Sequence, residues 1–214
     1  MLSCINITTK SIIKRKILVV GDGGCGKTCL LNVFTRGHFP QMYEPTIYEN
    51  YIHDIAINDK LSIELSLWDT AGQEELDRLR VFSYDNTHAI LVCYSINNRT
   101  SLDNIVNRWI HELQKECPQA KMILAALKCD LRSSSSSSSS SSTSTSTSNT
   151  NKIILYKEGL AVAKEMNAIR YFECSAKHNR GVQECFEQAA KIALTVHLPN
   201  DPLLKKKNKQ CMIM

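Results

Sequence analysis

Long apolar runs are missing from this chain of 214 residues. A helix that crosses a membrane needs about 20 consecutive apolar residues, whereas a typical apolar stretch here is residues 122–127. The first residues also lack the apolar segment of a secretory signal peptide. The sequence therefore predicts neither a membrane-spanning helix nor a secretory leader, and it indicates a cytosolic protein unless the C-terminus directs it elsewhere.

Cysteine pairs at metal-binding spacing are also missing. The nine cysteines are an odd number and include no C-x-x-C pair, and the six histidines show no ligand spacing. A zinc ribbon or a closed set of disulfides is therefore not indicated. We interpret the cysteines as free thiols in a reducing compartment.

A uniformly basic surface is a third absence. The net charge is +5, and much of the excess lies near the two ends. These clusters are Lys10, Lys14, Arg15 and Lys16, and Lys205, Lys206, Lys207 and Lys209. A nucleic-acid-binding face is therefore not indicated. With 43% hydrophobic and 22% charged residues, the composition is that of an ordinary globular protein with one sizeable core.

Residues 21–28 fit the pattern G-x-x-x-x-G-K-[ST] of a phosphate-binding loop. The apolar run 16–20 before the loop predicts a buried strand, and apolar residues at helical spacing follow it. In such a turn, glycines let backbone N–H groups close around an anion, and the helix N-terminus adds donors and partial positive charge. The side chain of Lys27 reaches the phosphates, and the Thr28 hydroxyl suits Mg²⁺.

Strands and helices alternate along the rest of the chain. Alternation and apolar runs predict strands at 51–57, 61–67, 89–94, 122–127 and 171–174, with the first two forming an antiparallel hairpin. Helical spacing predicts a short irregular helix at 76–84 and longer helices at 102–113, 156–166 and 182–193. This order is typical of an α/β fold with a mainly parallel sheet and helices on both faces.

Domain boundaries follow from composition. Residues 1–14 have no clear period, and we expect a loose extension there. Every residue from 133 to 148 is Ser or Thr, which predicts a disordered surface insertion, assigned to 133–150, inside a domain spanning 15–197. Residues 198–214 form a basic tail.

Polar motifs follow several of the predicted strands. They are the phosphate loop, Asp69, Asp130 and Ser175. Because ligands of such sheets bind beyond the carboxyl ends of the strands, we expect these motifs to converge on one site.

The pair Lys128-x-Asp130 indicates which nucleotide binds. The phosphate loop alone would accept ATP or GTP, but a carboxylate can accept two parallel hydrogen bonds from guanine N1–H and its exocyclic amine. Adenine has no such donor pair on that edge, so it would leave the acid unpaired. A backbone N–H from residues 174–177 is expected to reach guanine O6. These motifs in this order favour a guanine nucleotide.

With these motifs, the chain resembles the Ras superfamily of small GTPases, and within it the Rho family. The resemblance covers roughly 15–196 and the last four residues. Residues 69–74 are similar to the segment called switch II, and 39–51 to a Rho switch I. Residues 31–37 and 51–54 resemble those of a fungal Rho protein of polarised growth and secretion. The resemblance implies an α/β P-loop G domain with a mainly parallel six-stranded sheet, one antiparallel edge strand and helices on both faces.

The resemblance also implies a role for each matching residue. The GTP or GDP would be held by Gly21, Asp22, Gly23, Gly24, Cys25, Gly26, Lys27, Thr28, Cys29, Phe39, Tyr43, Thr46, Asp69, Gly72, Lys128, Asp130, Ser175, Ala176 and Lys177. Thr28 and Thr46 would ligate Mg²⁺, with Asp69 acting through water. The catalytic set would be Gln73, which orients the attacking water, together with Lys27, Thr46 and Gly72.

One departure from the family pattern concerns exchange. Leu127 stands where the family usually has Asn or Thr, so a bond tying this loop to the phosphate loop is expected to be lost and nucleotide exchange to be faster. Two rival functions stay open. A non-hydrolysing nucleotide-bound scaffold is disfavoured by the intact Thr46, Asp69, Gly72 and Gln73, and an ATP-dependent phosphotransferase by Asp130.

The last four residues, beginning at Cys211, fit the C-a-a-X prenylation pattern beside the lysine cluster. We expect a lipidated, monomeric protein on the cytoplasmic face of the plasma membrane, with a cytosolic pool. The resemblance implies as partners an exchange factor, a GTPase-activating protein, effectors and a guanine-dissociation inhibitor. The effectors would act in cell polarity, actin organisation and secretion.

Overall fold

The computed structural model describes residues 11–42, 45–134 and 153–199. Its elements are β1 (Ser11–Gly21), α1 (Lys27–Arg36), β2 (Tyr48–Asn58), β3 (Leu61–Thr70), η1 (Glu74–Leu76), α2 (Asp77–Val81), β4 (Ala89–Ser95), α3 (Arg99–Asn104), η2 (Ile105–Trp109), α4 (Ile110–Glu116), β5 (Lys121–Leu127), α5 (Leu131–Ser134), α6 (Tyr156–Glu165), β6 (Arg170–Glu173) and α7 (Val182–Leu194).

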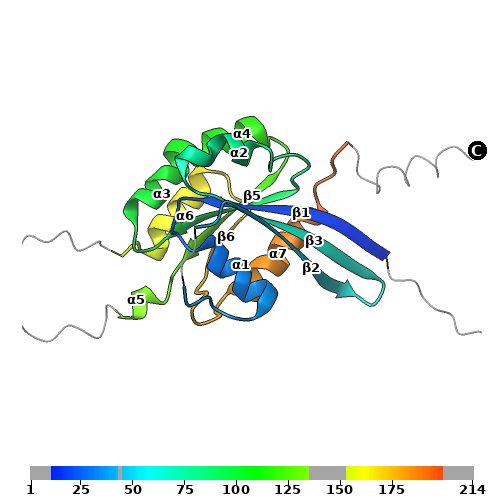
Figure 1. The fold of residues 1–214 in the computed structure, drawn as a ribbon, viewed down its shortest axis with the longest axis horizontal. Helices are drawn as coiled ribbons and strands as arrows, with labels where there is room; N and C mark the ends of the chain where they lie inside the picture. The colour runs from blue at the N-terminus through cyan, green and yellow to red at the C-terminus, as the bar shows by residue number, and fades with distance from the viewer. Residues whose placement is uncertain (1–10, 43–44, 135–152, 200–214) are drawn as a thin grey trace, which may run out of the picture.

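The strands form one six-stranded sheet in the order β2-β3-β1-β4-β5-β6 (Figure 1). Only the β2–β3 pair is antiparallel, as the short connection between these strands predicts. The other pairs are parallel. All residues of the central β4 are buried, which explains why its sequence is apolar throughout rather than alternating. The predicted sheet, with its antiparallel edge strand, is confirmed.

Helices cover both faces of this sheet (Figure 1). Helices α1 and α7 pack on one face around Phe34 and Phe186, whose rings stack at 4.2 Å. The helical run from α3 to α4, together with α6, covers the other face around Trp109. The predicted helix at 102–113 is longer at both ends, since the helical run extends from Arg99 to Glu116. It starts earlier because the Asn98 side chain caps it by accepting from the Ser101 N–H. None of the helices in the described part of the chain is long and apolar enough to span a membrane.

The N-terminal boundary predicted from the sequence is wrong. The expected loose extension reached residue 14, but β1 begins at Ser11, where it pairs in parallel with Leu61 of β3. The ion pair between Lys14 and Glu64, at 2.9 Å, joins the same two strands. A partner strand distant in sequence therefore orders a segment that shows no periodicity of its own. Residues 1–10 lie outside the described part.

The flanks of the insertion lie side by side. Arg132 in α5 donates a hydrogen bond of 2.9 Å to the carbonyl of Ile154, and it also forms an ion pair with Glu173 in β6. Helix α5 includes residues 133 and 134, which corrects the predicted start of the disordered insertion at 133. The remainder of the predicted insertion lies outside the described residues. The residues that flank the insertion are therefore held together, and they are attached to the sheet through Glu173 of β6.

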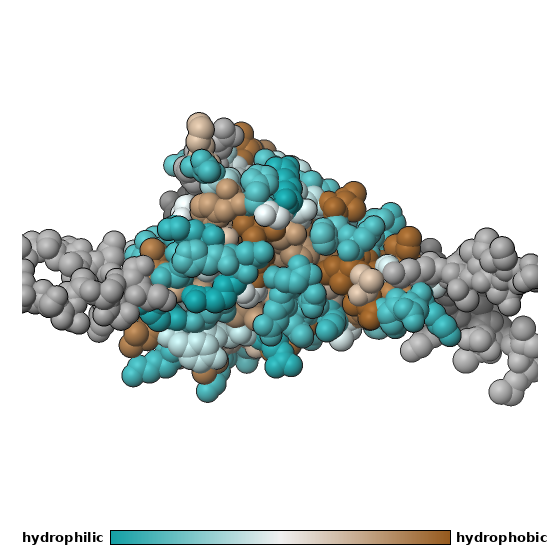
Figure 2. All heavy atoms as spheres, turned by 90° about the horizontal axis from the view of Figure 1, so that it is seen from below, coloured by the Kyte–Doolittle hydropathy of each residue, from teal (hydrophilic) through white to brown (hydrophobic). Residues whose placement is uncertain are grey.

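The tail boundary also moves slightly. Leu198, assigned to the tail, is buried with the domain, whereas residues 200–214 lie outside the described part. Viewed from below, the surface is mainly hydrophilic and is broken by separate apolar patches (Figure 2). This pattern is ordinary for a folded domain, whose surface always retains some apolar residues.

Candidate functional site

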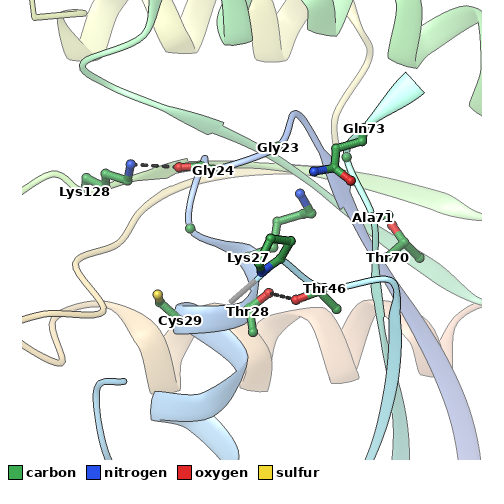
Figure 3. Close-up of a pocket in the computed structure, with 13 residues that line it drawn as sticks. Gly23, Gly24, Lys27, Thr28, Cys29, Thr46, Thr70, Ala71, Gln73 and Lys128 are labelled. Carbon is green, nitrogen blue, oxygen red and sulfur yellow. Dashed lines mark hydrogen bonds between the residues drawn. The ribbon is translucent and has the colours of Figure 1, made fainter. Parts of the chain in front are cut away.

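The predicted motifs converge at the carboxyl ends of the parallel strands. Two neighbouring pockets lie there and share Gly26, Cys29 and Lys128. The first, drawn in Figure 3, is lined by Gly23, Gly24, Gly26, Lys27, Thr28, Cys29, Pro45, Thr46, Thr70, Ala71, Gly72, Gln73 and Lys128. The second is lined by Gly26, Cys29, Leu30, Phe39, Leu127, Lys128, Asp130, Leu131, Ala176 and Lys177. One elongated site thus joins the phosphate loop to the Lys128-x-Asp130 motif.

The phosphate loop has the geometry that its glycines allow. Gly26 adopts φ 111°, a left-handed value, immediately before α1 begins at Lys27. The Lys27 ammonium is buried and donates to the carbonyls of Gly21 and Asp22 at 2.7 and 2.9 Å. The ammonium is therefore held across the loop, and a buried cation at a helix N-terminus suits an anionic ligand.

The Asp22 side chain points toward the helical run from α3 to α4. Its carboxylate accepts hydrogen bonds from the Asn104 amide at 2.7 Å and from the Trp109 indole N–H at 2.8 Å. Asp22 can therefore offer its backbone to a phosphate without placing a negative charge beside it. The sequence does not identify Asn104 and Trp109 as residues of this site, because the helical spacing of Trp109 is that of an apolar core residue. The only signal was that a buried indole N–H usually needs an acceptor.

Gly72 lies directly against the phosphate loop. A Cβ atom at this position would be 2.3 Å from the carbonyl oxygen of Gly21 and 2.4 Å from the amide nitrogen of Gly23. Only glycine fits there without moving one of the segments. The neighbouring Gln73 is exposed and borders the same pocket, where its side chain lies between Gly23 and Ala71 (Figure 3).

A group of oxygen atoms beside Lys27 suits a divalent cation. The hydroxyls of Thr28 and Thr46 lie 2.7 Å apart (Figure 3). Both Asp69 carboxylate oxygens are buried and make no hydrogen bond of ordinary geometry with another described residue. Burial raises the pKa of Asp69 to about 6, an effect that the nearby Thr28 hydroxyl and Lys27 charge offset only in part. Oxygen ligands of this kind are those that Mg²⁺ prefers, and the donor set fits it.

The base end of the site is organised around Asp130. This carboxylate is nearly buried and accepts a hydrogen bond of 2.6 Å from the Ser175 hydroxyl. The Ser175 N–H donates to the Arg180 carbonyl, so it is already used. Within the described part of the chain, no such bond is found for the Ala176 N–H. Ala176 is therefore the better candidate donor to guanine O6 within the predicted segment 174–177.

Lys128 ties the base end to the phosphate loop. Its ammonium donates to the Gly24 carbonyl at 2.8 Å (Figure 3), while its own backbone adopts φ 62°. The neighbouring Leu127 side chain is buried beside Gly26. A Cβ atom added at Gly26 would lie 3.7 Å from Cδ1 of Leu127. Contacts between these two loops therefore exist without the Asn or Thr that the family usually carries at position 127.

The structure brings together the predicted site residues that it describes. Tyr43 and Cys211 lie outside the described residues. Cys25 is buried below the loop, where burial raises the pKa of its thiol, and Cys29 borders both pockets. The described residues include no cluster of three or more His, Cys, Asp or Glu side chains that could hold a metal ion. A metal here would depend on the hydroxyls and on nucleotide oxygens as well as on Asp69.

Comparison with known proteins places this geometry in a family. The model of the Ras family matches residues 16–195. The chain is 55% identical to GTP-binding protein rho3 of Schizosaccharomyces pombe over 194 residues, which cover 91% of this chain and 89% of the relative. It is 49% identical to GTP-binding protein RHO3 of Saccharomyces cerevisiae, over 97% of this chain and 96% of the relative. RHO3 of Eremothecium gossypii is 53% identical, over 88% and 87%.

The family match spans nearly the whole folded domain, and the relatives align along most of both chains. The chain therefore belongs to the Ras family, and within it to the Rho GTPases, small proteins that bind and hydrolyse GTP.

Proposed function

We propose that this protein is a Mg²⁺-dependent Rho switch that reports the state of its guanine nucleotide to effectors of cell polarity, actin organisation and secretion. The proposed magnesium site is supported by one observation: the buried Asp69 carboxylate lies beside two threonine hydroxyls that are 2.7 Å apart. A buried carboxylate that is only partly compensated is costly, and a divalent cation would complete the compensation. When bound, Mg²⁺ neutralises charge on the β- and γ-phosphates.

The chain's own groups supply the rest of the phosphoryl-transfer machinery. The Lys27 ammonium, already aimed across the loop, would bind the phosphates, and the Gly72 N–H would donate to a γ-phosphate oxygen. Gln73 is exposed where it borders the pocket, and its amide would orient the attacking water. Asp130 would select guanine over adenine through two parallel hydrogen bonds. Since no arginine borders this pocket among the described residues, we propose that an activating protein supplies one.

Switching follows from where these groups sit. Thr46 and Gly72 belong to the connections after α1 and after β3, and both border the phosphate-loop pocket, where we place the γ-phosphate. Binding of GTP would hold both segments, and hydrolysis would release them. The same segments would then present different surfaces to an exchange factor, an activating protein, a dissociation inhibitor and effectors.

Single-turnover hydrolysis tests this function. Purified protein loaded with GTP should convert it to GDP and phosphate slowly, and Gln73→Leu should retain GTP when a matching activating protein is added. Chelation of Mg²⁺ should speed release of a fluorescent GDP from the wild type, because Thr28 would hold the cation that offsets the charge of the phosphates. Hydrolysis unchanged in Gln73→Leu, or nucleotide release indifferent to chelation, would contradict the respective assignment.

We also propose membrane anchoring through a prenyl group on Cys211. One lipid chain gives only marginal binding, and four nearby lysines at about 1 kcal/mol each would add roughly 4 kcal/mol against an anionic leaflet. This supports a location on the cytoplasmic face of the plasma membrane with a cytosolic pool. Cys211→Ser should move the protein to the soluble fraction with nucleotide binding unchanged. Persistent pelleting with membranes would place the anchor elsewhere.

A further inference from the structure

Arg80 is a buried arginine on a short helix at the protein surface. Its side chain is 1% exposed, although the neighbouring Leu79 and Val81 on α2 are 56% and 42% exposed. Burial of a guanidinium is costly unless its donors are used. The burial of Arg80 therefore depends on the groups that accept its hydrogen bonds.

The guanidinium is fixed on several sides. Glu112 of α4 accepts two hydrogen bonds from it, at 3.0 and 3.1 Å, in the bidentate manner that fixes a guanidinium plane. Its flat face lies 4.6 Å from the centre of the Trp109 ring. Asp77 accepts a further bond of 2.7 Å, and Arg108 bonds to the same carboxylate. Two cations and two carboxylates thus share this cluster.

One donor of Arg80 leaves the cluster and reaches the nucleotide site. The Nη1 group donates to the carbonyl of Ala71 at 2.9 Å, and Ala71 borders the phosphate pocket (Figure 3). This carbonyl and the Gly72 N–H belong to the same peptide unit. A trans peptide is planar, with C=O and N–H pointing in opposite directions, and the described chain has no cis peptide bond. Holding the carbonyl on one side therefore aims the N–H to the other.

We propose that Arg80 is a positioning residue, which orients the Ala71–Gly72 peptide so that the Gly72 N–H faces the γ-phosphate of bound GTP. This inference rests on the proposed roles of Gly72 and of GTP as ligand. GDP has no γ-phosphate, so the effect of Arg80 is confined to the GTP-bound protein. The helix that carries Arg80 is thereby linked to recognition of the third phosphate.

The same cluster also holds the phosphate loop itself, through Trp109. The Trp109 ring that packs against Arg80 donates its N–H to Asp22 of the phosphate loop at 2.8 Å. The Ala71–Gly72 peptide, through Arg80, and the phosphate loop, through Asp22, are therefore both held by side chains of the helical run from α3 to α4. A displacement of Arg80 would change the angle of the Gly72 N–H while the loop stays in place.

Paired nucleotide-release measurements test this role. Arg80→Met keeps a long side chain but removes every donor. Arg99→Met is the matched control, because the ion pairs found for Arg99 among the described residues are with Asp103 and Glu158, and Arg99 borders neither nucleotide pocket. Release of fluorescent GDP and of a fluorescent, non-hydrolysable GTP analogue is followed at saturating Mg²⁺. We expect Arg80→Met to release the analogue about tenfold faster relative to GDP, the size of one hydrogen bond to a charged group.

A purely structural role for Arg80 would alter the release of both nucleotides equally, and that result would overturn the proposal. Glu112→Gln provides a second variant should Arg80→Met fail to fold, because it keeps the shape of the clamp and loosens the grip on Arg80. It should shift the same ratio in the same direction, by about threefold. An unchanged ratio in a folded Glu112→Gln protein would also refute the role. Wild-type protein that fails to bind the GTP analogue would instead refute the proposed function.

Discussion

Replacing Gly72 by alanine is the sharpest test of the site. The new methyl would lie 2.3 Å from the Gly21 carbonyl oxygen and 2.4 Å from both the Asp22 carbonyl carbon and the Gly23 nitrogen. Non-bonded contacts of this kind need about 3.5 Å. The two segments must therefore separate by about 1 Å. Backbone strain is not involved, because Gly72 does not have a left-handed φ.

The segment that moves is expected to be the one carrying position 72. The phosphate loop is held by Lys27 on its inner side and by Asn104 and Trp109 through Asp22. A shift of about 1 Å takes the amide of residue 72 beyond hydrogen-bond range of a γ-phosphate oxygen. Loss of one hydrogen bond to a charged group costs about 1.5–3 kcal/mol. Affinity for GTP should fall roughly 10- to 150-fold, with much less effect on GDP.

Gly37→Ala is the control for this variant. Gly37 ends α1 with φ 72° and has open space where a Cβ would lie, so alanine there costs backbone strain without a clash. Dissociation constants for GDP and for a non-hydrolysable GTP analogue are measured for both variants and the wild type. Gly37→Ala should lower the melting temperature and keep the wild-type ratio of the two constants. A wild-type ratio in Gly72→Ala would refute the close approach of Gly72 to the loop.

Four further predictions concern the base, the loops and the fold. Asp130→Asn should weaken GDP binding and favour xanthine nucleotides, since the amide donates to the added carbonyl; unchanged GDP affinity would contradict the base assignment. Trp109→Phe keeps an aromatic ring but loses the indole N–H that holds the Asp22 carboxylate of the phosphate loop, so release of fluorescent GDP should accelerate several-fold. Unchanged release would show that other contacts hold the loop. Leu127→Asn should slow the same release, and equal or faster release would show that the loop contacts already compensate. Gly159→Ala, normally stabilising in a helix by about 1 kcal/mol, should lower the melting temperature because its Cβ would lie 2.1 Å from the Tyr94 hydroxyl and 2.2 Å from the Tyr171 hydroxyl, and Tyr94→Phe with Tyr171→Phe should restore part of the loss.

Much of the site was predictable because its motifs are short and continuous in sequence, and because the apolar runs show where the strands end. The sequence run 21–28 carries the loop, and its apolar flanks identify the strand and helix that hold it. Asp69 lies near the end of the apolar strand β3 and Asp130 follows β5, and the rule that parallel strands end at one edge brings them together. Recognising the family supplied the individual roles, which spacing alone would not.

Tertiary structure decided the features that depend on partners distant in sequence. Ser11 belongs to a strand only because β3 pairs with it, and no local pattern records that pairing. Asp22 is part of a phosphate motif, yet its carboxylate bonds to Trp109, 87 residues away. Arginine is usually found at the surface, but Arg80 is buried because Glu112 and the Ala71 carbonyl accept hydrogen bonds from its guanidinium. Periodicity along the chain determined the elements and the motifs, whereas the directions of these side chains are set by packing and hydrogen bonds that form only when the helices close over the sheet.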